Sequence, residues 1–150
     1  MFGSDDLYQE IIMDHNRSPR NYGAIDDPTV AIEGFNPLCG DQIKVYVLLN
    51  DDKIMDIAFD GIGCAISKSS ASIMTVELKG KRVSDAQSIF DAFRKMITGK
   101  DLNEDQLDAL GDSEVLGGVS KYPARIKCAS LAWHTVNSAL SGDSNVVTTE

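Results

Sequence analysis

The sequence of 150 residues has no apolar run long enough to span a membrane and no excess of basic residues. A transmembrane helix needs about 18 or more consecutive apolar residues, so we expect no membrane span. The formal net charge of −9 repels phosphate backbones and argues against nucleic-acid binding. The first residues, MFGSDDLYQE, lack the basic and apolar regions of a secretory signal, so we expect a cytoplasmic protein.

Cysteine is scarce: the chain has three, and no two of them form a Cys-x-x-Cys pair. An odd number of cysteines in a reducing compartment disfavours a disulfide framework. The paired-cysteine spacing of zinc fingers is also missing, so no local motif proves a metal site. The three thiols are therefore inert core residues, catalytic thiols, or metal ligands that only the fold brings together.

The pattern of apolar residues predicts one domain over residues 1–150, with a polar, disordered tail at 141–150. Strands are expected at 29–35, 42–49 and 54–59. Helices are expected at 5–16, 67–79, 84–98, 103–110 and 123–140. The short links between successive strands favour an antiparallel meander. We therefore predict an α+β fold, in which helices cover a three-stranded antiparallel sheet.

Two local signals refine the helical half of the chain. Ser84 and Gln87 have the spacing of a capping box, which predicts the start of the helix at 84–98. The segment 111–123 is rich in turn-forming residues and is expected to be a loop. Pro123 then suits the first turn of the last helix.

The three cysteines fall outside the apolar faces of the predicted strands. Cys39 lies in the turn between the first two strands, Cys64 follows the third strand, and Cys128 lies early in the last helix. Gly40 follows the first cysteine and Gly63 precedes the second, so the backbone there can bend tightly around an ion. This placement favours metal ligands, although three buried free thiols remain an alternative because free cysteine is commonly buried.

Asp41 is the candidate fourth ligand, because it follows Cys39 by two residues and its carboxylate can reach the same ion. The alternative is an Asx residue that stabilises the turn. The two histidines are weaker candidates. His15 lies on the apolar stripe of the first helix, and His134 points away from Cys128 on the last helix.

Arg125 precedes Cys128 by three positions and shares its helix face. Its guanidinium could offset the negative charge of three thiolates and a carboxylate around Zn²⁺, or hold a thiolate that leaves the metal. The alternative is an ordinary exposed arginine on a helix.

Three motifs, each with one cysteine, carry a family resemblance: NPLCGD, FDGIGCAIS and GVSKYPARIKCASLAW. Together they resemble the SufU-type branch of the IscU/NifU-N iron–sulfur cluster assembly family, from the first helix to about residue 140. The resemblance implies a compact α+β fold with a three-stranded antiparallel sheet. It also implies a zinc ion held by Cys39, Asp41, Cys64 and Cys128.

The same resemblance implies a function. SufU-like proteins accept sulfur from a PLP-dependent cysteine desulfurase of the SufS type. By similarity, Cys39 would take the persulfide sulfur, which then passes to downstream iron–sulfur assembly proteins. A zinc-dependent sulfurtransferase is therefore the leading hypothesis.

The main alternative is an IscU-type scaffold, on which a [2Fe–2S] cluster is built at the same thiolates. In that branch a histidine directly precedes the third cysteine, and this sequence has Lys127 there. The chaperone-recognition segment LPPVK is replaced by GGVSKYPARIK, and the acidic segment 100–114 resembles an insertion of the SufU branch. A third hypothesis is a structural zinc domain that only binds another protein.

Overall fold

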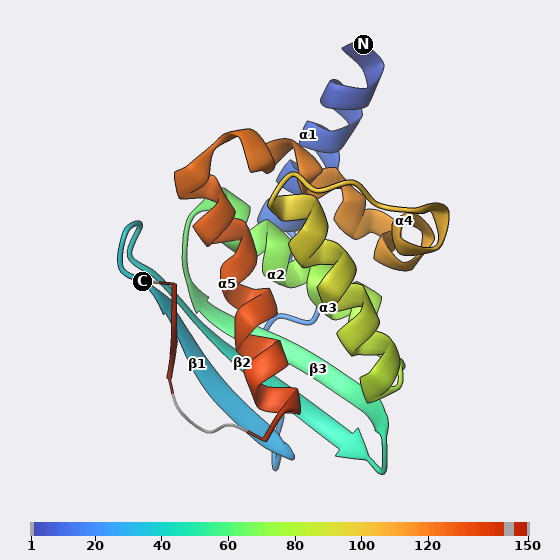
Figure 1. Cartoon of the computed structure of the whole chain (residues 1–150). Helices are drawn as coiled ribbons and strands as arrows, with labels where there is room; N and C mark the ends of the chain where they lie inside the picture. Colours follow the sequence, from blue (N-terminus) through green and yellow to red (C-terminus); the bar gives the residue numbers. More distant parts are fainter. Residues whose placement is uncertain (1, 143–145, 150) are drawn as a thin grey trace.

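In the computed structural model, which describes residues 2–142 and 146–149, helices are packed on one face of a twisted sheet (Figure 1). The strands are β1 (Val30–Asn36), β2 (Asp41–Asn50), β3 (Lys53–Ile62) and β4 (Val147–Thr148). Their order in the sheet is β3-β2-β1-β4. The α+β class with helices on a sheet is therefore confirmed.

The strands β1, β2 and β3 form the predicted antiparallel meander. The turn between β2 and β3 is tight, and Asp51 adopts a φ of 56° there. Aspartate tolerates this left-handed conformation better than most residues do. The β1–β2 register pairs Asn36 with Asp41, so the intervening turn brings the end of β1 against the start of β2.

The number of strands was predicted wrongly, because the sheet has a fourth strand and is mixed. β4 pairs in parallel with β1, with Val147 opposite Gly34. The sequence predicted a disordered tail at 141–150, of which 143–145 and 150 lie outside the described residues. A strand of two residues is too short to show an alternation of apolar and polar residues. Its partner, β1, lies more than 100 positions earlier in the sequence and would otherwise be an edge strand with unpaired backbone groups.

The helices follow the predicted order. They are α1 (Phe2–Arg17), α2 (Ala65–Leu78), α3 (Val83–Ile97), α4 (Glu104–Leu110), the 3₁₀ helix η1 (Gly111–Lys121) and α5 (Pro123–Leu140). α5 packs against β1 and β2, and α2 packs against β3 and against α5 (Figure 1). No helix in the described part of the chain is long and apolar enough to cross a membrane.

The core lies between the sheet and the helices α2, α3 and α5. Trp133 is fully buried and stacks on Phe93, with ring centroids 4.2 Å apart. Its indole N–H donates a hydrogen bond to Ser70 Oγ at 3.0 Å. This bond joins α5 to the serine-rich helix α2.

Two local predictions in the helical half were wrong. α3 starts one residue before Ser84, and its N-cap residue, Arg82, makes no side-chain capping bond. A reciprocal capping box is found instead at α4, between Asn103 and Gln106. The segment expected as a loop at 111–123 is largely the 3₁₀ helix η1, because Val115, Leu116 and Val119 bury apolar side chains under it.

Candidate metal centre

Three chain segments that are far apart in sequence meet at one end of the sheet. Cys39 lies in the turn between β1 and β2, and Asp41 is the first residue of β2. Cys64 is the N-cap residue of α2, and Cys128 lies in the second turn of α5. The turn before Asp41 is tight because Gly40 adopts a φ of +72° there, a conformation that favours glycine.

Three of the four predicted ligands converge. The Sγ atoms of Cys39 and Cys128 and a carboxylate oxygen of Asp41 all lie within 4.8 Å of one another. The two sulfur atoms are 3.3 Å apart, and both cysteines are free thiols. One divalent ion can contact donors at these separations, because Zn–S bonds are about 2.3 Å and Zn–O bonds about 2.0–2.2 Å long.

Cys64 lies beside this group but is not a member of it. Its main-chain N–H donates a hydrogen bond to Asp41 Oδ1 at 2.9 Å, which ties the start of α2 to the start of β2. Its Sγ accepts the N–H of Ser67 at 3.5 Å and so caps the helix. The backbone of Cys64 is therefore anchored to the centre, while its sulfur is engaged with the helix.

The predicted ligands differ in their exposure. Asp41 is 0% exposed and Cys128 is 3% exposed, whereas Cys39 is an exposed residue and Cys64 is partly buried. Cys39 is therefore the thiol that a second protein can reach. Asp41 and Cys128 are the two buried members of the group.

The electrostatics of the centre oppose ionisation of its deepest thiol. Burial raises the pKa of Cys128, and its contacts with the thiols of Cys39 and Cys64 and the negative charge of Asp41 raise it further. A divalent cation reverses this balance, because it stabilises thiolates and lets them bind at neutral pH. The centre is thus a set of donors that favours a bound cation.

The space around these donors supports the same interpretation. A Cβ atom at Gly63 would lie 3.1 Å from Asp41 Oδ1 and 3.1 Å from Ser67 Oγ, so a side chain there would crowd the carboxylate. Ser67 Oγ is buried and has no hydrogen-bond partner among the described residues. Two thiols and a carboxylate are donors that zinc accepts, and the residues of this group fit such an ion.

Asn36, which was not among the predicted site residues, is 0% exposed and contacts two of the donors. Its side-chain Nδ2 donates to Asp41 Oδ2 at 3.0 Å and lies 3.6 Å from Cys128 Sγ. The signal was available, because Asn36 opens the NPLCGD motif. An asparagine before a proline is typical of a turn, however, and this local interpretation hid the contact.

The other residues considered as ligands lie elsewhere. His15 is buried, and its Nδ1 is 2.7 Å from Ser72 Oγ. His134 packs its ring against Phe90, with centroids 5.7 Å apart. The described group of metal-ligating side chains contains neither histidine.

Among the described residues, the side chain of Arg125 contacts Tyr122 and makes no hydrogen bond or ion pair with the cysteines. The residue is exposed, and its guanidinium carbon lies 5.1 Å from the ring centroid of Tyr122. This cation–π contact keeps the guanidinium at the start of α5, the helix that carries Cys128.

Each of the three segments that carry a cysteine also carries an exposed apolar side chain. These side chains, which we call the apolar rim, are Leu38, Ile62 and Tyr122. Leu38 directly precedes Cys39, and Ile62 lies two residues before Cys64.

These observations define a class: an α+β protein with thiols and a carboxylate gathered at one end of its sheet, where they could hold a metal ion. The family follows from comparison with known proteins. The NifU-like N terminal domain family matches residues 7–129, and the chain belongs to that family.

Two relatives show the range of the family. The chain is 44% identical over 137 residues to the zinc-dependent sulfurtransferase SufU of Bacillus subtilis, covering 91% of each chain. It is 41% identical over 139 residues to the iron–sulfur cluster assembly scaffold protein IscU of Streptococcus pyogenes, covering 93% of this chain and 86% of the relative.

A solved structure agrees with the fold. The crystal structure of a protein from Fervidobacterium islandicum, described as an iron–sulfur cluster assembly scaffold for the SUF system, superposes with a TM-score of 0.80. The two chains are 35% identical, and the match covers 92% of this chain and 99% of the other.

Proposed function

We propose that this protein accepts sulfur from a cysteine desulfurase at Cys39, within a zinc centre, and delivers it to iron–sulfur cluster assembly. One observation carries the proposal: donor atoms of Cys39, Asp41 and Cys128 lie within 4.8 Å of one another. Only Cys39 of the three is exposed, so the centre combines a reachable thiol with buried ligands. The name of the B. subtilis relative supports zinc and sulfur transfer.

The proposed zinc ligands are Cys39, Asp41, Cys64 and Cys128. When bound, zinc would hold the thiols as thiolates at neutral pH. The chain contributes the orientation of the ligands: Asp41 Oδ1 accepts the Cys64 N–H at 2.9 Å, and Asp41 Oδ2 accepts Asn36 Nδ2 at 3.0 Å. A buried carboxylate that is held at both oxygens keeps its position when a neighbouring ligand reacts.

The proposed transfer is a thiol–persulfide exchange. The Cys39 thiolate attacks the terminal sulfur of a persulfide on the desulfurase, and a new S–S bond forms. The S–S bond of the donor breaks, and the desulfurase cysteine leaves as a thiolate. Sulfur moves without net oxidation or reduction, so the step needs no further reactant.

The proposed donor is a PLP-dependent cysteine desulfurase of the SufS type, and the acceptors are downstream iron–sulfur assembly proteins. The apolar rim supports docking of a protein at this site, because Leu38 and Ile62 flank the cysteine-bearing segments and are exposed. The net charge of −9 would favour a partner with a basic contact surface.

We further propose that Arg125 assists the transfer by attracting the negatively charged sulfur group. The guanidinium lies at the start of α5, against Tyr122 of the apolar rim. This position is close to the proposed docking surface. A selective effect of Arg125→Lys on transfer, with metal content unchanged, would support the assignment, because lysine keeps the charge but not the planar donors.

A scaffold function is the second candidate, and the relatives named IscU favour it. The same thiols could hold a [2Fe–2S] cluster as cargo. The two functions differ in whether the purified protein holds zinc or takes up a cluster. They also differ in whether the protein passes on sulfur or a cluster.

The experiment measures metal content and desulfurase turnover together. Sulfur transfer predicts about one tightly held zinc per chain and faster release of alanine from cysteine when the protein is added to a SufS-type desulfurase. A centre that takes up iron and sulfide and passes a cluster to an apo-ferredoxin, without stimulating the desulfurase, would favour the scaffold. Tight zinc with neither activity would leave only a structural domain and would contradict both functions.

A further inference from the structure

The C-terminal strand is joined to the metal centre through one buried side chain, Asn36. Thr149, the residue after β4, donates its hydroxyl hydrogen to Asn36 Oδ1 at 2.8 Å. Asn36 Nδ2 donates to Asp41 Oδ2 at 3.0 Å and lies 3.6 Å from Cys128 Sγ. The tail, the amide and two of the proposed ligands thus form one hydrogen-bonded chain.

The orientation of the amide follows from its neighbours. The carboxylate of Asp41 accepts hydrogen bonds, so the NH₂ group of Asn36 faces it, as the 3.0 Å contact shows. The amide oxygen is then left to accept the hydroxyl of Thr149. Because Asn36 is 0% exposed, water is not an alternative partner, and a loss of either contact is costly.

Contacts close to this residue hold the tail against β1. β4 pairs with β1 over two register positions, Val147 with Gly34 and Thr148 with Phe35. The main-chain N–H of Thr149 donates to the carbonyl of Phe35 at 3.2 Å. The end of β4 therefore reaches the turn that carries Cys39, as Figure 1 shows.

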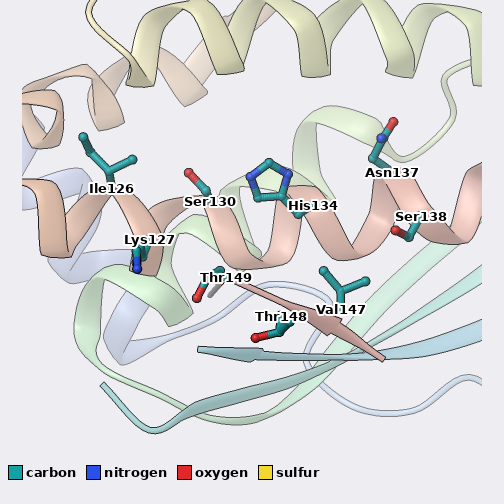
Figure 2. A pocket seen from close by; sticks show the side chains of 9 residues that line it. All are labelled: Ile126, Lys127, Ser130, His134, Asn137, Ser138, Val147, Thr148 and Thr149. Atoms are coloured by element: carbon teal, nitrogen blue, oxygen red, sulfur yellow. The ribbon is translucent and has the colours of Figure 1, made fainter. Parts of the chain in front are cut away.

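Thr149 also lies where two grooves meet. One groove runs between α5 and β4 and is lined by residues such as Lys127, Ser130, His134 and Thr149 (Figure 2). The other is lined by Asn36, Pro37, Leu38, Lys127 and Thr149. The second groove opens next to the turn that carries Cys39, so the tail borders the proposed docking surface.

We propose that Asn36 is a positioning residue for the metal centre and that the C-terminal strand sets its position through Thr149. Docking of the tail then strengthens metal binding, and release of the tail weakens it. The inference rests on the proposed metal centre. Hydrogen bonds to metal ligands of this kind typically change metal affinity about 10- to 100-fold when they are removed.

Two variants test the two links. Asn36→Asp keeps the shape of the side chain but removes the donor and places a like charge beside Asp41. We expect Zn²⁺ affinity, measured by chelator competition, to fall about 10- to 100-fold. Thr149→Val keeps the shape of the tail residue but removes the hydroxyl, and we expect a fall of about two- to tenfold.

A matched control and a spectroscopic measurement separate positioning from general stability. Thr29→Val removes a hydroxyl that accepts the N–H of Leu49 at 2.8 Å, just before the opposite end of β1. The visible spectrum of the Co²⁺-substituted protein reports the ligand field directly. We expect Thr149→Val to shift this spectrum and Thr29→Val to leave both spectrum and affinity unchanged, with similar thermal unfolding of the two metal-free variants.

The outcomes distinguish the inference from the function on which it rests. A wild-type protein that takes up neither Zn²⁺ nor Co²⁺ would contradict the metal centre, and the inference with it. A wild-type protein that binds both, together with Thr149→Val and Asn36→Asp variants that match it in affinity and spectrum, would overturn the inference alone. If Asn36→Asp fails to fold, the comparison of Thr149→Val with Thr29→Val still decides.

Discussion

The Sγ atoms of Cys39 and Cys128 lie 3.3 Å apart, although 89 positions separate the two residues in the sequence. One belongs to an exposed turn and the other to a buried face of a helix. A thiol that solvent and partners can reach is thereby backed by a thiol that they cannot. This division between a reactive ligand and a fixed ligand underlies the proposed function.

Loss of the Asp41 charge should release the metal. Asp41→Asn keeps the size of the side chain, but the neutral amide is a poorer ligand and cannot accept hydrogen bonds at both ends, as the carboxylate does from Asn36 and Cys64. We expect zinc affinity to fall at least about tenfold. Chelator competition measures it.

Asp56→Asn is the control for that substitution. Asp56 lies on β3, where it pairs with Lys79 at 3.3 Å, and it is not part of the described metal-ligating group. The zinc affinity of the Asp56→Asn variant should equal that of the wild type. Equal affinity in the Asp41→Asn variant as well would remove the carboxylate from the ligand set.

A methyl group at Gly63 should disturb the centre without unfolding the protein. In Gly63→Ala the new Cβ would lie 3.1 Å from both Asp41 Oδ1 and Ser67 Oγ, so the carboxylate must shift by a few tenths of an ångström. We expect a loss of about 1 kcal/mol in the free energy of unfolding, measured with urea, and a several-fold weaker affinity for zinc.

Gly118→Ala is the matched control, because a Cβ at Gly118 meets no atom within 4 Å and its φ is not in the left-handed region. Its zinc affinity should be unchanged, and its stability should be equal or higher. If both alanine variants bind zinc as the wild type does, the space beside Gly63 is not required by the centre.

The stability of the protein should fall as the pH drops below about 6.5 because of His15. Burial lowers the pKa of His15 from its ordinary value of 6.5, and the nearby Arg20 lowers it further, while Asp14 and Asp112 act weakly in the opposite direction. The unfolded chain therefore takes up a proton at a higher pH than the folded chain. The contribution of His15 is complete above pH 6.5 and is lost as the pH falls towards its folded pKa.

The variant His15→Asn tests this account. Ser72 Oγ already accepts the N–H of Arg20 at 2.8 Å, so its own hydrogen is free to reach His15 Nδ1, and an asparagine oxygen can accept it without titrating. Urea unfolding at about pH 7.5 and pH 5.5 should show a smaller loss of stability in the variant. An identical loss in both proteins would assign the pH dependence to other groups.

Part of this molecule could be predicted from sequence because the signals are local. The alternation in 42–49 and the short turns around it predict a meander, and the glycines next to Cys39 and Cys64 predict loops that can surround an ion. The motifs also placed Asp41 beside the thiols. These features depend on neighbours in the sequence, where propensity and period are informative.

The rest depends on contacts that no local pattern records. β4 has two residues, and its partner strand β1 precedes it by more than 100 positions, so a polar tail predicted nothing but disorder. In the sequence, Asn36 is typical of a turn residue. Its contacts with Thr149 and Cys128 join residues that are far apart in the sequence. The Ser84 and Gln87 spacing predicted a capping box that α3 does not form, because the helix starts at Val83, one residue before Ser84.

The central claim is that Cys39 receives the sulfur, and mapping the persulfide by peptide mass spectrometry tests it most directly. The zinc-loaded protein is mixed with a SufS-type desulfurase and L-cysteine, alkylated and digested. The account predicts an additional sulfur on the peptide that contains Cys39, and none on a Cys39→Ala variant that keeps the helical circular dichroism of the wild type. A persulfide found on Cys64 or Cys128 of the wild type, or persisting on Cys39→Ala, would contradict it.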